Sequence, residues 1–270
     1  MRDEDEIAEA LAGIALEAGA AILRHYHEGT TARLKSDESP VTAADEEAEA
    51  IILKALAAQF PNHLVLAEES VARDGLPQRL ADEFFLVDPL DGTREFLARN
   101  GEFTVNIALV RGTAPVAGVV YAPALGVMFW GGRHAYHAHL PAAALALPAG
   151  ESIRCRAPMQ PLAVLESRSH MTAADKAAVA KLGPHLTRAV GSSLKFGYIA
   201  SAEADVTLRL GPTMEWDTAA GDAVLRAAGG MTFTDDGAPM LYGKLEHGLK
   251  NGAYVAWGAP ERGQGRRWQD

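Results

Sequence analysis

The feature that most constrains this chain is a turn of six residues, 88–93, with the sequence Asp-Pro-Leu-Asp-Gly-Thr. The apolar run 84–87 before it predicts a buried strand that delivers Asp88 at its C-terminal end, where open α/β sheets bind their ligands. Pro89 forces a turn that brings Asp88 and Asp91 toward one point. Two carboxylates and the backbone carbonyl of Leu90 suit a hard cation such as Mg²⁺. A lone Asp-Pro or Asp-Gly pair would indicate an ordinary polar turn, but here two acids, a tight turn and a helix start coincide.

The end of the same turn predicts a site for an anion. Gly92 lets the backbone approach a ligand closely, and Thr93 opens a short helical pattern over residues 94–98. A helix start offers free N–H groups and the positive end of the helix dipole. The turn as a whole therefore indicates a site for a metal ion and an anion.

Three further acids can each be interpreted in two ways, as part of this site or as a residue that serves only the local structure. Glu68 follows the strand pattern 64–67 as Asp88 follows its own strand, although a Glu-Glu pair alone is usually solvated surface. Asp45 comes three residues after Thr42 at the start of a helix predicted over 43–59, and this spacing alone favours a capping box. Asp217 lies in the first turn of a later helix that ends at residues 229–230, where an acid also complements the helix dipole.

The length, the net charge and the cysteine content limit the classes of protein to which the chain can belong. The chain has 270 residues and a formal charge of −10, which argues against polymeric nucleic acid as a partner. Cys155 is the only cysteine, so an intrachain disulfide is excluded and a reducing cytosol fits. The acidic start lacks the basic region of a signal peptide, and no apolar run is long enough for a membrane span. We expect a cytoplasmic protein with a substantial core.

The periodicity predicts two subdomains. Residues 1–150 contain helices over 4–27 and 43–59 and an antiparallel meander of strands over 103–110, 115–121 and 126–131. Residues 141–150, rich in Ala and Pro, mark the boundary. Residues 151–270 follow an α/β pattern, with a strand over 162–165, a helix over 172–182 capped by Thr172, and a strand over 206–210. A short strand at 189–190 precedes a helix that begins within 191–196.

Three motifs in this order resemble the signatures of the Mg²⁺-dependent, lithium-sensitive inositol monophosphatase superfamily. They are Glu68-Glu69, the turn 88–93, and residues 216–221, Trp-Asp-Thr-Ala-Ala-Gly. The resemblance runs from about residue 5 to residue 258. Residues 91–96, 100–106 and 191–196 are similar to the 3′(2′),5′-bisphosphate nucleotidase branch of CysQ type, although Arg94 stands where this branch often has Lys. The fold implied is a layered α-β-α-β-α sandwich of the inositol monophosphatase/fructose bisphosphatase kind.

The resemblance also implies roles for individual residues. Glu68, Asp88 and the Leu90 carbonyl would hold one Mg²⁺, and Asp88, Asp91 and Asp217 a second, with a third, weaker ion near Glu68. Asp45 and Thr93 would orient and deprotonate the attacking water, so that Asp45 serves both as cap and in catalysis. The full set of substrate-binding residues implied is Glu68, Leu90, Asp91, Gly92, Thr93, Ser192, Ser193, Lys195 and Asp217.

The function expected is Mg²⁺-dependent hydrolysis of adenosine 3′,5′-bisphosphate to AMP and phosphate. Lys195 and the adjacent serines would contact the second phosphate of the nucleotide. Two alternatives are an inositol or other sugar-phosphate phosphatase of the same fold and a non-catalytic binding protein. The partner expected is a small nucleotide bisphosphate; a homodimer and a peripheral location at the inner face of the cell membrane are left open.

Overall fold

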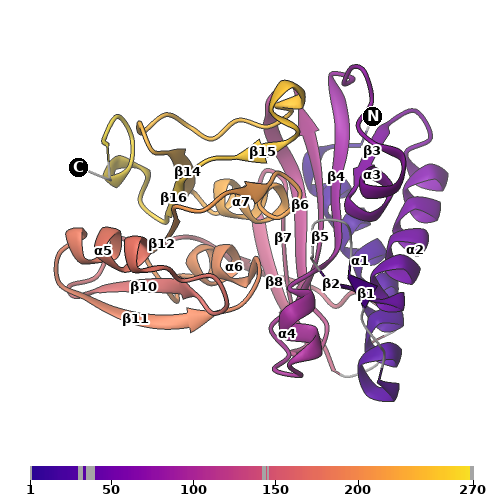
Figure 1. Cartoon of the computed structure of the whole chain (residues 1–270), viewed down its shortest axis with the longest axis horizontal. Coiled ribbons are helices and arrows are strands. Elements are labelled where there is room, and N and C mark those ends of the chain that lie inside the picture. Colours follow the sequence, from indigo (N-terminus) through magenta and orange to yellow (C-terminus); the bar gives the residue numbers. More distant parts are fainter. Residues whose placement is uncertain (1, 30–32, 35–39, 142–143, 145, 268–270) are drawn as a thin grey trace.

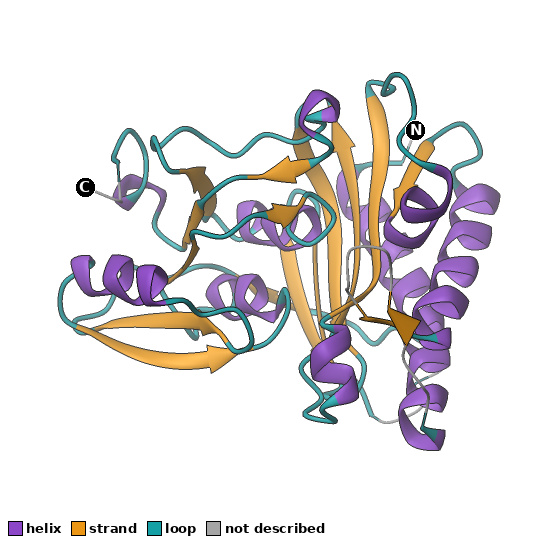
Figure 2. Cartoon of the chain, in the orientation of Figure 1, coloured by secondary structure: helices purple, strands orange, loops and turns teal. Residues whose placement is uncertain are grey.

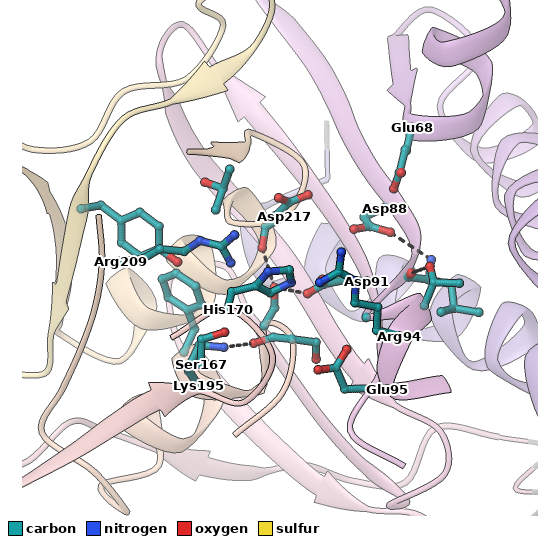
Figure 3. A pocket seen from close by; sticks show the side chains of 18 residues that line it. Glu68, Asp88, Asp91, Arg94, Glu95, Ser167, His170, Lys195, Arg209 and Asp217 are labelled. Atoms are coloured by element: carbon teal, nitrogen blue, oxygen red, sulfur yellow. Dashed lines mark hydrogen bonds between the residues drawn. The ribbon is translucent and has the colours of Figure 1, made fainter. Parts of the chain in front are cut away.

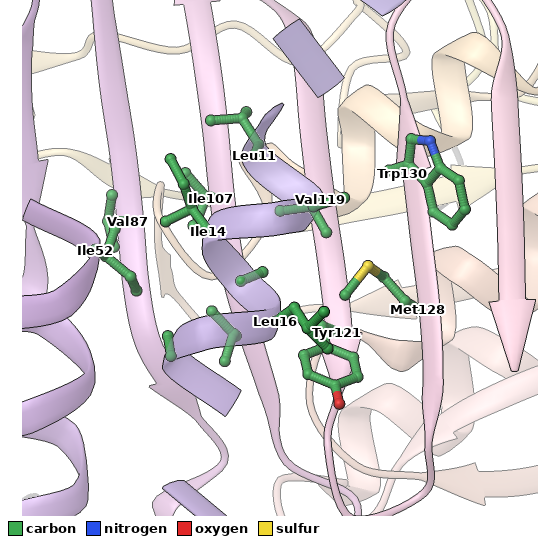
Figure 4. Close-up of a cluster of buried hydrophobic side chains, with 14 of the residues drawn as sticks. Leu11, Ile14, Leu16, Ile52, Val87, Ile107, Val119, Tyr121, Met128 and Trp130 are labelled. Carbon is green, nitrogen blue, oxygen red and sulfur yellow. The ribbon is translucent and has the colours of Figure 1, made fainter. Parts of the chain in front are cut away.

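Two long helices form the first layer of the fold, α1 (Glu4–Glu28) and α2 (Ala43–Gln59). The structure is a computed structural model that describes residues 2–29, 33–34, 40–141, 144 and 146–267. Asp3 and Glu6 form a capping box at the start of α1, and Thr42 and Asp45 form one at the start of α2, so both helices begin where the sequence predicts. Their apolar faces pack on one sheet, where Leu11, Ile14 and Ile52 are among the buried side chains (Figure 4).

The second layer is a sheet of seven strands in the order β3-β4-β5-β6-β7-β8-β9. Strand β3 is parallel to β4, and every later pair is antiparallel, so the predicted meander is confirmed. The strands β4 to β6 are buried on both faces, which explains their nearly continuous apolar sequences. The bounds are β3 (Leu64–Ala67), β4 (Glu83–Asp91), β5 (Thr104–Arg111), β6 (Ala114–Ala122), β7 (Val127–Gly131), β8 (Ala135–His139) and β9 (Glu151–Ile153).

Two shorter helices, α6 (Leu194–Ala200) and α7 (Ala219–Ala227), lie on the opposite face of this sheet (Figure 1). Helix α7 sits close to β6 and β7 because Gly118 and Gly131 leave room for it. A Cβ added at Gly118 would stand 2.8 Å from the Ala220 carbonyl oxygen, and one at Gly131 would stand 2.8 Å from the Ala227 Cβ. This close packing of α7 on the sheet fixes the start of the helix, just after Asp217.

A second sheet and one helix complete the layers. The five strands of this second sheet run in the order β11-β10-β12-β16-β14. Their bounds are β10 (Leu162–Ser167), β11 (His185–Val190), β12 (Val206–Arg209), β14 (Met231–Thr234) and β16 (Tyr254–Trp257). Helix α5 (Ala173–Lys181), capped by Thr172 as predicted, covers its far face through Ala178 and Val179. The α-β-α-β-α sandwich is confirmed and can be followed in Figure 2.

Several elements were not predicted from the sequence. Helix α3 (Glu68–Asp74) begins directly after β3, where no helix was predicted, and β9 still belongs to the first sheet although it lies beyond residue 150. The division into subdomains at that residue stays a prediction. In the described residues, no helix combines the length and apolar character that crossing a bilayer requires. The remaining elements are α4 (Thr93–Leu97), β1 (Arg33–Leu34), β2 (Pro40–Val41), β13 (Thr213–Met214), β15 (Lys250–Asn251) and the 3₁₀ turns Leu245–His247 and Pro260–Arg262.

Candidate active site

A cavity of about 260 Å³ lies where the C-terminal end of β4 meets the start of α6, the end of β12 and the residues before α7 (Figure 3). Segments that are far apart in the sequence therefore share one pocket. Of the residues predicted for the site, all but Asp45 line it: Glu68, Asp88, Leu90, Asp91, Gly92, Thr93, Ser192, Ser193, Lys195 and Asp217.

The turn at residues 88–93 is formed by an irregularity in the sheet. Strand β4 continues past the predicted end, and its register with β5 shifts between the pairs Asp88–Asn106 and Asp91–Thr104. Such a bulge re-aims side chains at the edge of an active site. The Asp88 Oδ1 atom accepts a hydrogen bond from the Leu90 N–H at 3.0 Å. Gly92 has φ of +90°, a left-handed conformation that favours glycine, and Thr93 then starts α4.

Asp45 lies behind the cavity and joins α2 to the turn. Its Oδ2 atom accepts from the Thr42 backbone N–H at 2.8 Å and from the Thr42 hydroxyl at 2.7 Å, which is the predicted cap. Its Oδ1 atom stands 3.3 Å from the Thr93 hydroxyl, which also stands 3.4 Å from the Leu90 carbonyl and can donate to one of them at a time. The structure thus places Asp45 against both the helix start and the turn.

Neighbouring acids around the cavity raise the pKa values of Asp88 and Asp217. Burial, followed by the charges of Glu68, Asp91, Asp217 and Asp45, raises the pKa of Asp88 well above its usual range. Burial and the charges of Asp91 and Glu68 do the same to Asp217. Because neighbouring carboxylates disfavour the ionised forms of Asp88 and Asp217, the set is suited to a divalent cation, which would offset the repulsion.

The acid oxygens do not already form a closed cage. In the part of the chain that the structure describes, no group of three or more His, Cys, Asp or Glu side chains is arranged to hold a metal ion as it stands. The chemistry of the acids fits Mg²⁺, while the ligand set of each ion stays a prediction.

The serines predicted for the site are held by hydrogen bonds to the acids and to β5. The Ser193 hydroxyl lies 2.9 Å from Asp91 Oδ2 and 2.5 Å from the Asp217 carbonyl oxygen, either of which accepts its proton. It accepts from Asn106 Nδ2 at 3.1 Å. Ser192 Oγ accepts from the Thr104 hydroxyl at 3.1 Å. Ser193 therefore contacts the side chain of Asp91 and the backbone of Asp217, which come from different halves of the chain.

Lys195 is buried beside the cavity and holds the turn before it. Its ammonium group donates to the Val190 carbonyl at 3.3 Å and to the Ser192 carbonyl at 2.5 Å. Burial lowers the pKa of Lys195 to about 8, while the charge of Asp91 opposes this shift. The lysine thus neutralises part of the acidic wall as well as lining the pocket, and its predicted contact with a phosphate stays a prediction.

Three basic residues on the cavity wall were not predicted for the site. Arg209 ends β12, Arg94 lies in the first turn of α4, and His170 follows β10; Figure 3 shows them on the same cavity as the acids. Burial, with the charges of Arg209 and Arg94, lowers the pKa of His170. Arg209 stands at the C-terminal end of an apolar strand, which is the pattern that predicted Asp88 for the site. The sequence around His170 contains no comparable signal.

Comparisons with known proteins agree with this arrangement. The model of the inositol monophosphatase family matches residues 3–261. The 3′(2′),5′-bisphosphate nucleotidase CysQ of Escherichia coli strain K12 is 42% identical over 246 residues, covering 90% of this chain and 96% of that protein. The corresponding protein of Salmonella typhimurium is 41% identical over 249 residues, covering 92% and 98%.

Solved structures show the same fold. The crystal structure of CysQ from Bacteroides thetaiotaomicron, a bacterial member of the inositol monophosphatase family, is similar with a TM-score of 0.77 at 34% identity, covering 93% of this chain and 96% of that one. An inositol monophosphatase from Anabaena matches with a TM-score of 0.73 at 24% identity, covering 95% and 92%. The shared motifs, the layered fold and the family match together show that this chain belongs to the inositol monophosphatase family.

Proposed function

We propose that this protein is a metal-dependent 3′(2′),5′-bisphosphate nucleotidase that converts adenosine 3′,5′-bisphosphate to AMP and phosphate. The single observation that carries the proposal is that acids and basic residues line one cavity. Glu68, Asp88, Asp91 and Asp217, which suit cations, share it with Lys195, Arg209 and Arg94, which suit a second anion. The sequence relatives named as bisphosphate nucleotidases support the same activity, and their family is one of metal-dependent phosphatases.

The acids would hold two or three Mg²⁺ ions. Glu68, Asp88 and the Leu90 carbonyl would hold one, and Asp88, Asp91 and Asp217 another. When bound, Mg²⁺ polarises phosphoryl oxygens and increases the acidity of nearby water. The chain contributes charge and orientation: the Ser193 hydroxyl can donate to one oxygen of Asp91, and the Leu90 N–H donates to one oxygen of Asp88.

Thr93 and Asp45 would activate the attacking water. When the Thr93 hydroxyl donates to Asp45 Oδ1, its lone pairs are free to accept a hydrogen bond from water. The water proton can then pass to Thr93 as the Thr93 proton passes to Asp45, which leaves the water oxygen to attack phosphorus. The bond from phosphorus to the ribose 3′-oxygen breaks, and the departing oxygen takes a proton from solvent water. The backbone N–H groups of Gly92 and Thr93, at the start of α4, would hold the phosphate that is cleaved.

The second phosphate of the nucleotide would lie near Arg209, at the end of β12. Arg209 is partly exposed there and lies within 3.5 Å of the Pro212 carbonyl, so its guanidinium keeps further N–H donors for a ligand. An inositol monophosphate carries no second phosphate and gains nothing from this arginine. The basic wall therefore favours a bisphosphate over a monophosphate.

The test compares two substrates and one variant. Phosphate release with Mg²⁺ is measured from adenosine 3′,5′-bisphosphate and from inositol 1-phosphate, and we expect a clear preference for the nucleotide. Arg209→Gln should raise KM for the nucleotide by roughly tenfold, the size of one lost charge-assisted hydrogen bond, and change KM for the inositol ester little. A preference for the inositol ester, or inactivity on both substrates, would overturn the proposal.

The last part of the proposal concerns where the protein is located and whether it forms oligomers. We infer a cytoplasmic enzyme whose partner is its small substrate. A homodimer and peripheral attachment at the inner membrane face stay predictions, which light scattering and flotation with anionic vesicles would test.

A further inference from the structure

Glu102, an acid that the proposed chemistry does not use, bridges the two halves of the molecule. It lies in the connection between α4 and β5, and its carboxylate accepts from Arg168 Nε at 2.5 Å and from Arg168 Nη2 at 2.7 Å. The same carboxylate accepts from the Gly191 backbone N–H at 2.6 Å. We call this set, Glu102, Arg168 and Gly191, the clasp. Two parallel bonds from one arginine make a geometrically specific ion pair.

Within the clasp, Glu102 is ionised and mostly shielded from water, whereas the Arg168 side chain is 40% exposed. Burial raises the pKa of Glu102, but the hydrogen bonds from Arg168 and Gly191 outweigh it, so that the pKa lies below the usual value. The side chain of Glu102 is 19% exposed. Arg168 also donates to the Ala189 carbonyl at 2.8 Å, so one arginine fixes both the acid and the end of β11.

Gly191 is pressed against the segment that carries the clasp. A Cβ added there would stand 2.7 Å from the Glu102 carbonyl oxygen, 2.8 Å from Glu102 Cβ and 2.9 Å from Glu95 Cγ. A side chain at this position would force the two halves apart. Glu95 makes a second bridge next to it by accepting a hydrogen bond from the Ser169 hydroxyl. The contact is therefore tightly packed as well as charged.

The turn that the clasp holds has a strained backbone. Ser192 has φ of +44°, which is unfavourable for a residue with a side chain and persists only where the surroundings impose it. Gly191, just before Ser192, is fixed by the clasp, and the Ser192 carbonyl is fixed by Lys195. Ser193, the next residue, reaches Asp91.

We propose that Glu102 and Arg168 are positioning residues that impose this turn and thereby set the preference for substrates with a second phosphate. The proposal rests on the proposed function, because Ser192 and Lys195 are placed by the turn on the part of the wall that would face that phosphate. Neither Glu102 nor Arg168 lines the cavity. They act through the turn and not by contact with the substrate.

The experiment uses the full chain with Glu102→Gln, which keeps the shape and removes the charge, and Arg168→Lys, which keeps the charge and removes the paired bonds. Glu47→Gln is the control, because Glu47 pairs with Arg24 at 2.6 Å on the exposed surface of α1 and α2. For each protein kcat and KM are measured with adenosine 3′,5′-bisphosphate and with adenosine 3′-monophosphate, which has the same cleavable ester and no second phosphate. Hydrogen exchange of residues 189–196 is measured without substrate.

The clasp variants should lower the ratio of kcat/KM for the bisphosphate to kcat/KM for the monophosphate by ~10-fold, mainly through KM. They should also speed exchange at residues 189–196, while Glu47→Gln changes neither quantity. Equal losses on both substrates would show only structural support and overturn the proposal, as would unchanged exchange. If the unmodified protein does not hydrolyse the bisphosphate, the proposed function fails, and the exchange measurement still decides whether the clasp holds the turn.

Discussion

At the scale of single residues, Asp45 shows how one carboxylate divides two tasks between its oxygens. Oδ2 accepts the hydrogen bonds of the helix cap, and Oδ1 faces Thr93. If the Thr93 hydroxyl relays the water proton, Thr93→Val should lower kcat by ~10²-fold or more, the usual contribution of general base catalysis, and leave KM and the melting temperature nearly unchanged. Steady-state phosphate release and a thermal melt measure these quantities.

Thr42→Val is the matched control, since it removes the hydroxyl donor to the other oxygen of the same carboxylate. It should cost about 1 kcal/mol of unfolding free energy, as lost helix caps do, and change kcat little. If both substitutions lowered kcat equally, Thr93 would have no special part in the reaction.

Asp91 permits a second prediction, in which activity and stability change in different directions. Burial raises the pKa of Asp91, which means that its ionised form is disfavoured in the folded protein without metal. Asp91→Asn should therefore abolish phosphate release while the melting temperature in excess chelator stays the same or rises. A calorimetric scan of both proteins tests this, and a large fall in melting temperature would show that the carboxylate serves the fold instead.

The acids of the site were predicted from the sequence, whereas Arg209, Glu102 and Arg168 were not. The position of Asp88 after an apolar strand indicated that acid, and the resemblance of three motifs was needed to bring Glu68, Asp45 and Asp217 into the site. Arg209 also follows a strand, but only the tertiary structure shows that it faces the same cavity. Glu102 sits in a loop, and its partners Arg168 and Gly191 are 66 and 89 residues away. No local pattern specifies such pairings.

At the scale of elements, the start of α5 predicts a dependence of stability on pH. Asp175 accepts from the Thr172 N–H and hydroxyl and from the Leu210 N–H, which joins the helix to the strand that carries Arg209. Burial raises the pKa of Asp175, but these hydrogen bonds outweigh it and the pKa falls below the ordinary 3.8. A depressed pKa in the folded state stabilises the protein above the unfolded pKa, and this contribution is lost as the pH falls through the folded value.

Asp175→Asn should therefore lower the free energy of unfolding by about 1 kcal/mol at pH 7. The difference in unfolding free energy between the variant and the unmodified protein should become smaller only below about pH 4. Urea unfolding from pH 7 down to pH 3 measures the difference. Asp74→Asn is the control, because Asp74 pairs with Arg73 on the exposed surface and should contribute nothing measurable. A difference that stays constant down to pH 3 would contradict the assigned cause.

Helices that begin with a side-chain cap were predicted well from the sequence. The helices after Thr42 and Thr172 begin where their caps indicate. By contrast, α3 starts without a side-chain cap, and β14 and β16 have only four residues each. Segments this short adopt their structure because neighbouring strands supply hydrogen bonds, which a single sequence does not display.

At the scale of the whole molecule, the site exists because two halves meet around α7. Leu90 and Asp91 end a strand of the first sheet, Arg209 ends a strand of the second, and Asp217 precedes the helix between them. The resemblance of three motifs predicted these layers correctly. The closeness of the layers depends on Gly118 and Gly131, which the sequence alone would have marked only as breaks in a strand.

Because the acids come from both halves, binding of metal ions should stabilise the molecule as a whole. A ligand that binds only the folded state at 100 times its Kd adds about 2.7 kcal/mol to the unfolding free energy, which in a chain of this size corresponds to a rise of roughly 5–10 °C in melting temperature. MgCl₂ should produce this rise in the chelator-treated protein. NaCl at equal ionic strength should produce less, since screening relieves only part of the repulsion among buried acids.

The Asp88→Asn variant, which lacks the carboxylate expected to be shared by both ions, should lose most of the Mg²⁺ effect. If the variant and the unmodified protein gained equally from MgCl₂, the ions would be binding elsewhere, and the acids around the cavity would need another explanation.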